Sequence, residues 1–203
     1  MKTIITLLLF ISVQYYTNYD LKSGGYRVGD IASDFNLKNI DGKMVSMANF
    51  RDAKGFIIAF TCNTCPFAIL YEQRIIALSD TYAPKGYPLI AINPNDPDLQ
   101  PGDSFENMQR RAHDKKYPFP YLQDVTQDVT RAYGATNTPH IFILKKIDGK
   151  FQVMYIGTID NNPKDPASAT KHFVDDAMND ILSGKPVQEP ETKAIGCGIK
   201  WKM

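Results

Sequence analysis

The chain of 203 residues is long enough for one domain with a substantial core, and it carries 23 Lys and Arg against 22 Asp and Glu. This near-neutral balance excludes a broad electrostatic attraction to nucleic acid or anionic lipid, and three cysteines are too few for a small disulfide-stapled fold. The sequence contains no internal repeat and no long block of like charge, so neither a solenoid nor a solvating tail is expected.

The first residues have the pattern of an export signal. Lys2 precedes the apolar run TIITLLLFISV, residues 3–13, which fits the core of a signal peptide and is short for a membrane span. We therefore expect residues 1–20 to be a signal peptide or an N-terminal anchor, and the protein to be exported, to the periplasm or another extracytoplasmic compartment. The alternative is a buried strand or helix of the domain. QYYTNYD follows without a small-residue cleavage pattern, so the cleavage site stays open.

The rest of the chain predicts strands and helices in a definite order. The expected elements are a hairpin around Asp41-Gly42, a buried strand at 55–60, a helix from Pro66 to Pro84, a buried strand at 87–93, a helix after Ser104, an extended piece at 117–124, a short helix at 125–134, a hairpin around Asp148-Gly149 and a helix at 167–182. The clearest signals are the wholly apolar GFIIAF and the apolar side chains that follow it at steps of three and four.

This order predicts the fold class and the domain limits. Strand–helix–strand units in the first half imply parallel pairing, and the late hairpin adds antiparallel strands. We expect an α/β fold with one mixed sheet and helices on both faces, formed by residues 25–184. No element is expected in the tail, residues 185–203.

Cys62 and Cys65 lie between the predicted strand at 55–60 and the helix that begins at Pro66. Functional residues gather at the carboxyl ends of strands in open α/β sheets. We expect both sulfur atoms at the first turn of the helix and accessible to a substrate, and at least one thiol with a lowered pKa, because a helix N-terminus stabilises a thiolate. With two residues between them, one thiolate can attack a disulfide and the other can resolve the mixed disulfide.

Other interpretations of the pair stay open. A zinc site needs four ligands, and only Cys197 and His140 are available to complete one. A permanent structural disulfide is compatible with an exported protein. The position of the pair between a buried strand and an amphipathic helix favours a redox centre over both, without a bound metal.

Thr138-Pro139 stands immediately before IFIL, a predicted strand. Proline marks the entry to a strand because it cannot donate to the ladder. A cis bond here would expose the preceding backbone beside the sulfur atoms for pairing with a bound peptide. An ordinary trans proline in a loop is the alternative.

These segments together resemble the thioredoxin fold, through FTCNTCP after FIIAF and through NTPHIFIL. GDIASDFNLKNIDGKMVSMANF resembles the start of the peroxiredoxin-like (AhpC/TSA) redoxin branch, which implies an N-terminal β-hairpin extension. FTCNTCPF, YAPKGYPLIAINPND, YPFPYLQD and TKAIGCGIKWK are similar to a largely uncharacterised group of that superfamily. The resemblance covers residues 29–160 and the tail.

The resemblance implies a thiol–disulfide oxidoreductase. By analogy with thioredoxins, Cys62 is the attacking thiol, Cys65 the resolving thiol and Pro139 the cis-proline. By analogy with peroxiredoxins, Cys65 is instead the peroxidatic cysteine. No cofactor is implied. The implied partners are protein or small-molecule thiols and disulfides and an unidentified electron donor, without nucleic acid, and with membrane tethering only through the N-terminal segment.

The sequence departs from both the peroxiredoxin and the thioredoxin patterns, and these departures determine the alternative functions. Ile58 and Cys62 stand where peroxiredoxins have a proline and a threonine or serine, and no arginine follows Arg131. A weak thiol-dependent peroxidase is therefore the second hypothesis. Thr61 replaces the usual thioredoxin tryptophan, and FIIAF lacks the buried acid, so another group must handle the proton.

Two further residues have a functional and a structural interpretation. His140 follows Pro139 and is a candidate to tune the thiolate or to carry a proton, or else it is a histidine packed at the sheet end. With the two cysteines it also resembles the copper site of Sco-type proteins, whose cysteines have three residues between them, so a non-catalytic copper-binding or redox-sensing protein is the third hypothesis. Cys197 is a third redox thiol, an intermolecular partner or an inert tail thiol, and Trp201 is expected to dock the tail on the core.

Overall fold

The computed structural model describes residues 24–202. Its main sheet contains β1 (Ile31–Ala32), β2 (Leu37–Asn39), β3 (Met44–Val45), β4 (Gly55–Phe60), β5 (Leu89–Asn93), β6 (Tyr121–Gln123), β8 (His140–Ile147) and β9 (Lys150–Gly157). The helices are α1 (Pro66–Tyr82), α2 (Phe105–Lys115), α3 (Asp128–Tyr133) and α4 (Phe173–Leu182). A separate two-stranded ladder joins β7 (Asn137–Thr138) to β10 (Cys197–Gly198). The expected signal peptide or anchor at 1–20 lies outside the described residues.

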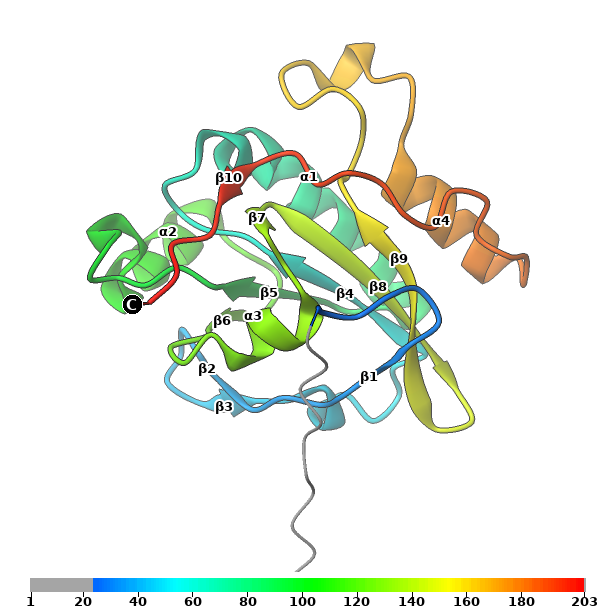
Figure 1. Ribbon diagram of the computed structural model, residues 1–203, viewed down its shortest axis with the longest axis horizontal. Coiled ribbons are helices and arrows are strands. Elements are labelled where there is room, and N and C mark those ends of the chain that lie inside the picture. The colour runs from blue at the N-terminus through cyan, green and yellow to red at the C-terminus, as the bar shows by residue number, and fades with distance from the viewer. Residues whose placement is uncertain (1–23, 203) are drawn as a thin grey trace, which may run out of the picture.

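The main sheet is mixed, with strand order β1-β9-β8-β4-β5-β6-β2-β3 (Figure 1). β4 pairs parallel with β5 and antiparallel with β8, and β5 pairs parallel with β6. The predicted parallel and antiparallel halves are thus confirmed, and the apolar run at 55–60 forms the central strand β4. All six of its residues are buried.

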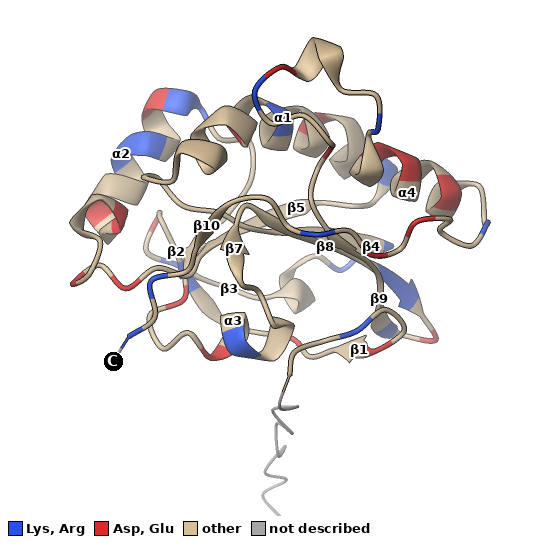
Figure 2. Cartoon of the chain, turned by 45° about the horizontal axis from the view of Figure 1, so that its top comes forward, with Lys and Arg blue, Asp and Glu red and all other residues tan. Residues whose placement is uncertain are grey.

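Alternation along the central strands divides the core into two layers. Ile57 and Ala59 point toward the layer that contains buried residues of α1, α2 and α4. Phe56, Ile58 and Phe60 point to the other side, where Tyr133 of α3 and the N-terminal segment pack. Figure 2 shows the three longer helices on one face of the sheet and α3 on the other, as the sequence predicted.

The N-terminal hairpin also forms where the Asp41-Gly42 turn predicts it. Gly42 has a φ of 84°, a conformation that glycine adopts without strain. β2 pairs antiparallel with β3 and with the edge of β6. The hairpin therefore extends the sheet by two short strands.

The structure differs from the predictions at α4. This helix begins at Phe173 and not at position 167. The backbone N–H groups of Thr170 and Lys171 donate to Oδ1 of Asn161, in the loop after β9, so this stretch is bound to the loop instead of extending the helix.

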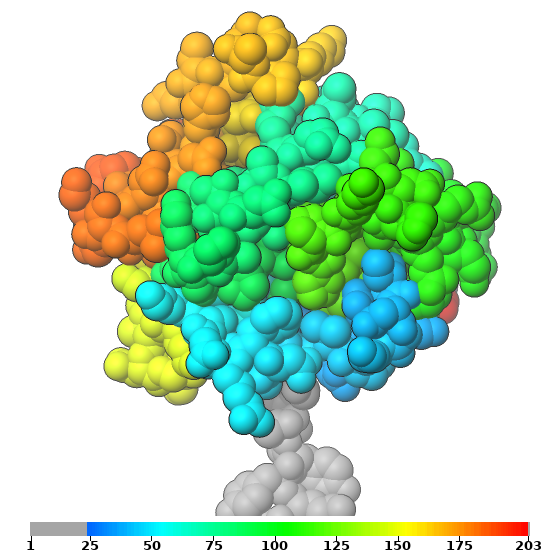
Figure 3. All heavy atoms as spheres, turned by 180° about the vertical axis from the view of Figure 1, so that it is seen from behind, coloured from blue at the N-terminus to red at the C-terminus, as the bar shows by residue number. Residues whose placement is uncertain are grey.

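The C-terminal tail contains β10, where no element was expected. β10 lies beside β7 (Figure 1). In the space-filling view from behind, the C-terminal residues are visible only at one edge of the molecule, so the end of the tail lies mainly on the side that Figure 1 shows (Figure 3). Among residues 24–202, no helix is both long and apolar enough to cross a bilayer.

Candidate active site

Cys62 and Cys65 lie at the carboxyl end of β4, where the chain turns into α1. Cys65 is the N-cap of the helix and Pro66 its first residue, a position where the missing N–H of proline costs no intrahelical hydrogen bond. Both cysteines lie where the sequence predicts them. The strand, the short connection and the helix fix the separation of the two side chains.

The Thr138-Pro139 peptide bond is cis, as the thioredoxin analogy implied. His140 pairs with Phe60 in the sheet, so Thr138 and Pro139 lie beside the residues that follow β4. The Sγ atom of Cys62 is 3.1 Å from Oγ1 of Thr138, and the Sγ atom of Cys65 is 3.1 Å from its carbonyl oxygen. Both sulfur atoms of the pair thus contact one residue, the one that precedes the cis-proline.

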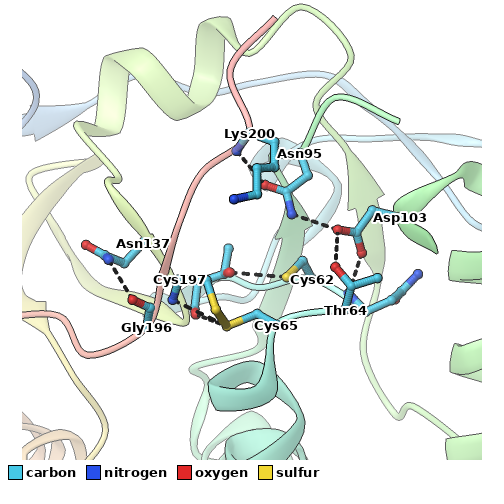
Figure 4. The surroundings of a disulfide bond; sticks show 11 residues. Cys62, Thr64, Cys65, Asn95, Asp103, Asn137, Gly196, Cys197 and Lys200 are labelled. Carbon is cyan, nitrogen blue, oxygen red and sulfur yellow. Dashed lines mark hydrogen bonds between the residues drawn. A yellow bond between two sulfur atoms is a disulfide. The ribbon is translucent and has the colours of Figure 1, made fainter. Parts of the chain in front are cut away.

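The disulfide of the described residues joins Cys65 to Cys197, across 132 positions of sequence, and leaves Cys62 free (Figure 4). The two Cα atoms are 5.9 Å apart, within the range for a disulfide. The backbone N–H of Cys197 donates to Sγ of Cys65 at 3.3 Å. Cys197 is therefore part of the site, and Trp201 packs against the core as expected of a docked tail.

The expectation of an accessible cysteine pair is wrong for this bridged form. Cys62 and Cys65 are each only 4% exposed. The two cysteines form a small buried cluster with Ala68, and Phe67 and Cys197 pack against this cluster.

The expectation that at least one thiol of the pair has a lowered pKa is not met at Cys62, and Cys65 does not titrate because it is disulfide-bonded. Burial raises the pKa of the Cys62 thiol, and the negative charge of Asp103 raises it further. The hydrogen bond with Thr138 and the backbone N–H groups of Cys65 and Thr64 oppose this by stabilising the thiolate. The helix N-terminus therefore contributes as expected, but burial outweighs it.

Asp103 is a site residue that sequence reasoning missed. It ends a short 3-10 turn, Pro101–Asp103, and is fully buried. Its carboxylate accepts hydrogen bonds from the backbone of Asn63 at 2.6 Å, the hydroxyl of Thr64 at 2.9 Å and the side-chain amide of Asn95 at 2.7 Å (Figure 4). In the sequence this acid belongs to a proline- and aspartate-rich loop, and nothing in that pattern distinguishes it from its exposed neighbours.

Thr61 and His140, which with Cys197 are the three possible accessory residues, are both buried. Thr61 extends the pairing of β4 by donating its N–H to the carbonyl of Ile92. The ring of His140 packs 4.8 Å from that of Phe142, and its Nδ1 accepts from the N–H of Thr136 at 3.4 Å. Burial lowers the pKa of His140 to about 4. These contacts favour the packed, neutral histidine over a proton carrier.

No group of three or more potential metal ligands occurs within residues 24–202. The geometry instead brings three sulfur atoms together beside one backbone edge. Two of them are already bonded, and the third belongs to a free thiol. Such an arrangement can carry out thiol–disulfide exchange without any further group.

Comparisons with known proteins agree with this chemistry and with the fold. The model of the AhpC/TSA family matches residues 28–155. The thiol-disulfide oxidoreductase ResA of Geobacillus thermodenitrificans is 27% identical over 164 residues, covering 78% of this chain and 87% of that protein.

Solved structures share the architecture. An uncharacterised conserved protein from Geobacillus kaustophilus superposes with a TM-score of 0.79 at 37% identity, covering 87% of this chain and 93% of that one. A thiol:disulfide interchange protein of the thioredoxin family from Chlorobium tepidum gives a TM-score of 0.52 at 21% identity, covering 65% of this chain and 87% of that one. The second likeness bears on the fold alone, which is thioredoxin-like.

Proposed function

The chain belongs to the AhpC/TSA family, and we propose that it is a thiol–disulfide oxidoreductase whose redox pair is Cys62 and Cys65. One observation supports this most directly: both sulfur atoms contact Thr138 immediately before a cis-proline, at the junction of β4 and α1. The relatives named for this activity support it as well.

The reaction is an exchange of disulfides. One thiolate of the reduced pair attacks a sulfur of the substrate disulfide, forming a mixed disulfide and releasing one substrate thiol. The second thiolate attacks the mixed disulfide, which releases the other substrate thiol and leaves Cys62 bonded to Cys65. Two electrons pass to the substrate, and an external dithiol returns the pair to the reduced state.

The remaining parts of the site have supporting roles in this proposal. Pro139 keeps the backbone of Thr138 beside the sulfur atoms, where an extended substrate segment can pair with it. The backbone N–H groups of Thr64 and Cys65 stabilise a thiolate at Cys62. The protein works outside the cytoplasm, because the pattern of residues 2–13 is that of an export signal.

Reduction of insulin by dithiothreitol tests this function. The full chain should accelerate the precipitation of the insulin B chain, and Cys65→Ser and the double variant Cys62→Ser/Cys197→Ser should each abolish the acceleration. Thermal unfolding of both variants checks that they fold. The proposal is wrong if folded wild-type protein gives no acceleration, or if either serine variant retains it.

A peroxidase is the second candidate, because the Cys65–Cys197 disulfide is the product expected of such a reaction. A Cys65 thiolate oxidised by a peroxide gives a sulfenic acid and an alcohol or water, and condensation with the Cys197 thiol gives the disulfide and water. Peroxide consumption that requires Cys65 and Cys197 but not Cys62 would favour this function. Consumption that is absent, or that requires Cys62, counts against it.

A further inference from the structure

The tail lies on the backbone edge where a substrate segment would pair. Cys197 is opposite Thr138 in an antiparallel ladder, and Gly198 is opposite Asn137. The side-chain amide of Asn137 donates to the carbonyl of Gly196 at 2.9 Å, and the N–H of Ile199 donates to the carbonyl of Thr136 at 3.2 Å. Strand addition at an exposed edge is a common way for proteins to bind an extended peptide.

The close approach of this strand depends on Gly196. A Cβ atom built on Gly196 would lie 2.2 Å from the carbonyl oxygen of Thr138, whereas a Cβ atom on Gly198 would meet nothing within 4 Å. The glycine before Cys197 thus permits the contact that brings the Cys197 sulfur to Cys65. The glycine after it has no such role.

Beyond Cys197 the tail is held independently of the disulfide. The N–H of Lys200 donates to Oδ1 of Asn95 at 2.9 Å (Figure 4), and its carbonyl accepts from Nε2 of Gln127 at 2.8 Å. Ile199 is buried, and the ring of Trp201 stacks with Arg131, with 4.6 Å from the guanidinium carbon to the ring centroid. These contacts keep Cys197 near the site after its disulfide breaks, so re-formation of the bridge is an intramolecular reaction.

We infer that Cys197 is a third redox-active cysteine and that residues 196–198 occupy the place of a substrate segment beside Thr138. These residues are displaced when Cys62 exchanges with the disulfide between Cys65 and Cys197. This rests on the proposed function and deepens it. The Cys62 thiol loses its proton to solvent, and its thiolate attacks Sγ of Cys65. A bond forms between Cys62 and Cys65, the bond to Cys197 breaks, and the Cys197 thiolate takes up a proton. The exchange requires no external oxidant, because one disulfide replaces another.

The positions of the sulfur atoms assign the roles of the pair. The internal occupant is bonded to Cys65, so Cys65 is the sulfur that forms the mixed disulfide with a substrate. Cys62 is free and touches the same threonine, so it is the sulfur that resolves it. These roles are the reverse of those implied by the thioredoxin analogy.

Peptide mapping of the oxidised full chain tests the exchange. Trypsin separates residues 55–74, which contain Cys62 and Cys65, from residues 194–200, which contain Cys197. In a glutathione redox buffer quenched with acid, wild-type protein should contain both the cross-linked peptides and the internally bridged 55–74. Cys62→Ser should contain only the cross-link between 55–74 and 194–200, and Cys197→Ser only the internal bridge. The absence of the cross-link from folded Cys62→Ser would overturn the inference.

Gly196→Ala and Gly198→Ala are a matched pair of variants that test the docking of residues 196–198 beside Thr138. Gly196→Ala should lower the cross-linked fraction about tenfold, which corresponds to about 1.4 kcal/mol, because the added Cβ atom would overlap the carbonyl oxygen of Thr138. Gly198→Ala should leave that fraction at the wild-type level. An equal loss in both variants, or in neither, would contradict the assignment of residues 196–198 to the substrate's place.

The assignment of roles has its own test with a chromogenic aromatic disulfide, 5,5′-dithiobis(2-nitrobenzoate), on reduced protein. Cys197→Ser should release two equivalents of thiolate, since Cys62 resolves the mixed disulfide at Cys65. Cys62→Ser/Cys197→Ser should release one and retain the other on residues 55–74. The assignment would be overturned if Cys65→Ser/Cys197→Ser, which keeps only Cys62, reacted rapidly while Cys62→Ser/Cys197→Ser, which keeps only Cys65, reacted slowly. Neither these assays nor the maps use insulin, so the inference can fail while the proposed function holds.

Discussion

The carboxylate of Asp103 accepts a 2.6 Å hydrogen bond from the backbone N–H of Asn63, the residue that follows Cys62. The same carboxylate holds the hydroxyl of Thr64, so a buried acid from a distant loop shapes the connection between the two cysteines. Its negative charge raises the pKa of Cys62. The charged group that influences the pKa of the Cys62 thiol thus comes from the turn before α2 and not from the central strand.

Asp103→Asn should lower both the stability of the folded protein and the pKa of the Cys62 thiol. One amide oxygen cannot replace two carboxylate oxygens that accept three hydrogen bonds, and hydrogen bonds to charged groups contribute about 1.5–3 kcal/mol. Loss of the negative charge removes an effect that raises the pKa of Cys62, so the midpoint of its reaction with iodoacetamide, measured on protein with the Cys65–Cys197 bridge intact, should move to lower pH.

Urea unfolding gives the stability, and Asp98→Asn is the control, because Asp98 is exposed in the same loop. A midpoint that moves to higher pH in Asp103→Asn, or that moves equally in Asp98→Asn, would contradict the electrostatic role of Asp103.

Thr138→Val should shift the pKa of the Cys62 thiol in the opposite direction, to a higher value. The valine keeps the shape of the buried threonine but removes the hydroxyl that lies 3.1 Å from Sγ of Cys62. Since that hydrogen bond lowers the pKa of Cys62, its loss should raise the midpoint of the iodoacetamide reaction. Thr138→Ser keeps the hydroxyl and should stay close to wild type. The hydrogen bond has no such effect if valine and serine give the same midpoint.

His140 should make the protein sensitive to acid. Its pKa is lowered from 6.5 to about 4 by burial, so below pH 6.5 the unfolded chain binds a proton that the folded protein does not. Stability should therefore be fully present above pH 6.5 and fall by about 3 kcal/mol as the pH approaches 4, at 1.36 kcal/mol per pH unit.

Guanidinium unfolding at several pH values in His140→Phe, which keeps an aromatic ring against Phe142, measures this contribution. The loss of stability between pH 6.5 and pH 4 should be smaller in this variant than in wild type. His113 is exposed, so His113→Gln is the control and should retain the wild-type slope. An unchanged slope in His140→Phe would show that His140 is not the titrating group.

The ion pair between Arg74 and Asp160 should stabilise the helix that carries the site. Arg74 lies on α1 and Asp160 in the loop after β9, with side chains only 14% and 3% exposed. The carboxylate also accepts a hydrogen bond of 3.0 Å from the hydroxyl of Tyr71. Arg74→Met leaves a buried carboxylate without its partner and should cost about 3–5 kcal/mol.

The comparison is Lys171→Met, which removes an exposed ion pair with Glu189 at 3.9 Å. It should cost less than about 1 kcal/mol. Equal losses in the two variants, measured by urea unfolding, would rule out the special contribution of the buried pair.

Local patterns of the sequence determined most of the fold. The apolar run of β4, the helical spacing of α1 and the Asp-Gly turns each encode their element within a few residues, so the sheet and both helix layers could be predicted. The same local signals placed Cys62 and Cys65 at the strand–helix junction and Pro139 immediately before β8.

Only the tertiary structure decided which sulfur atoms are bonded and what surrounds them. Three cysteines allow three different bridges, and no sequence pattern selects the one between Cys65 and Cys197. That pairing depends on the path of the tail across the core, and the role of Asp103 depends on a loop that packs against residues 40 positions earlier. Contacts over such separations result from the packing of the whole chain, so they leave no periodic or local signal in the sequence.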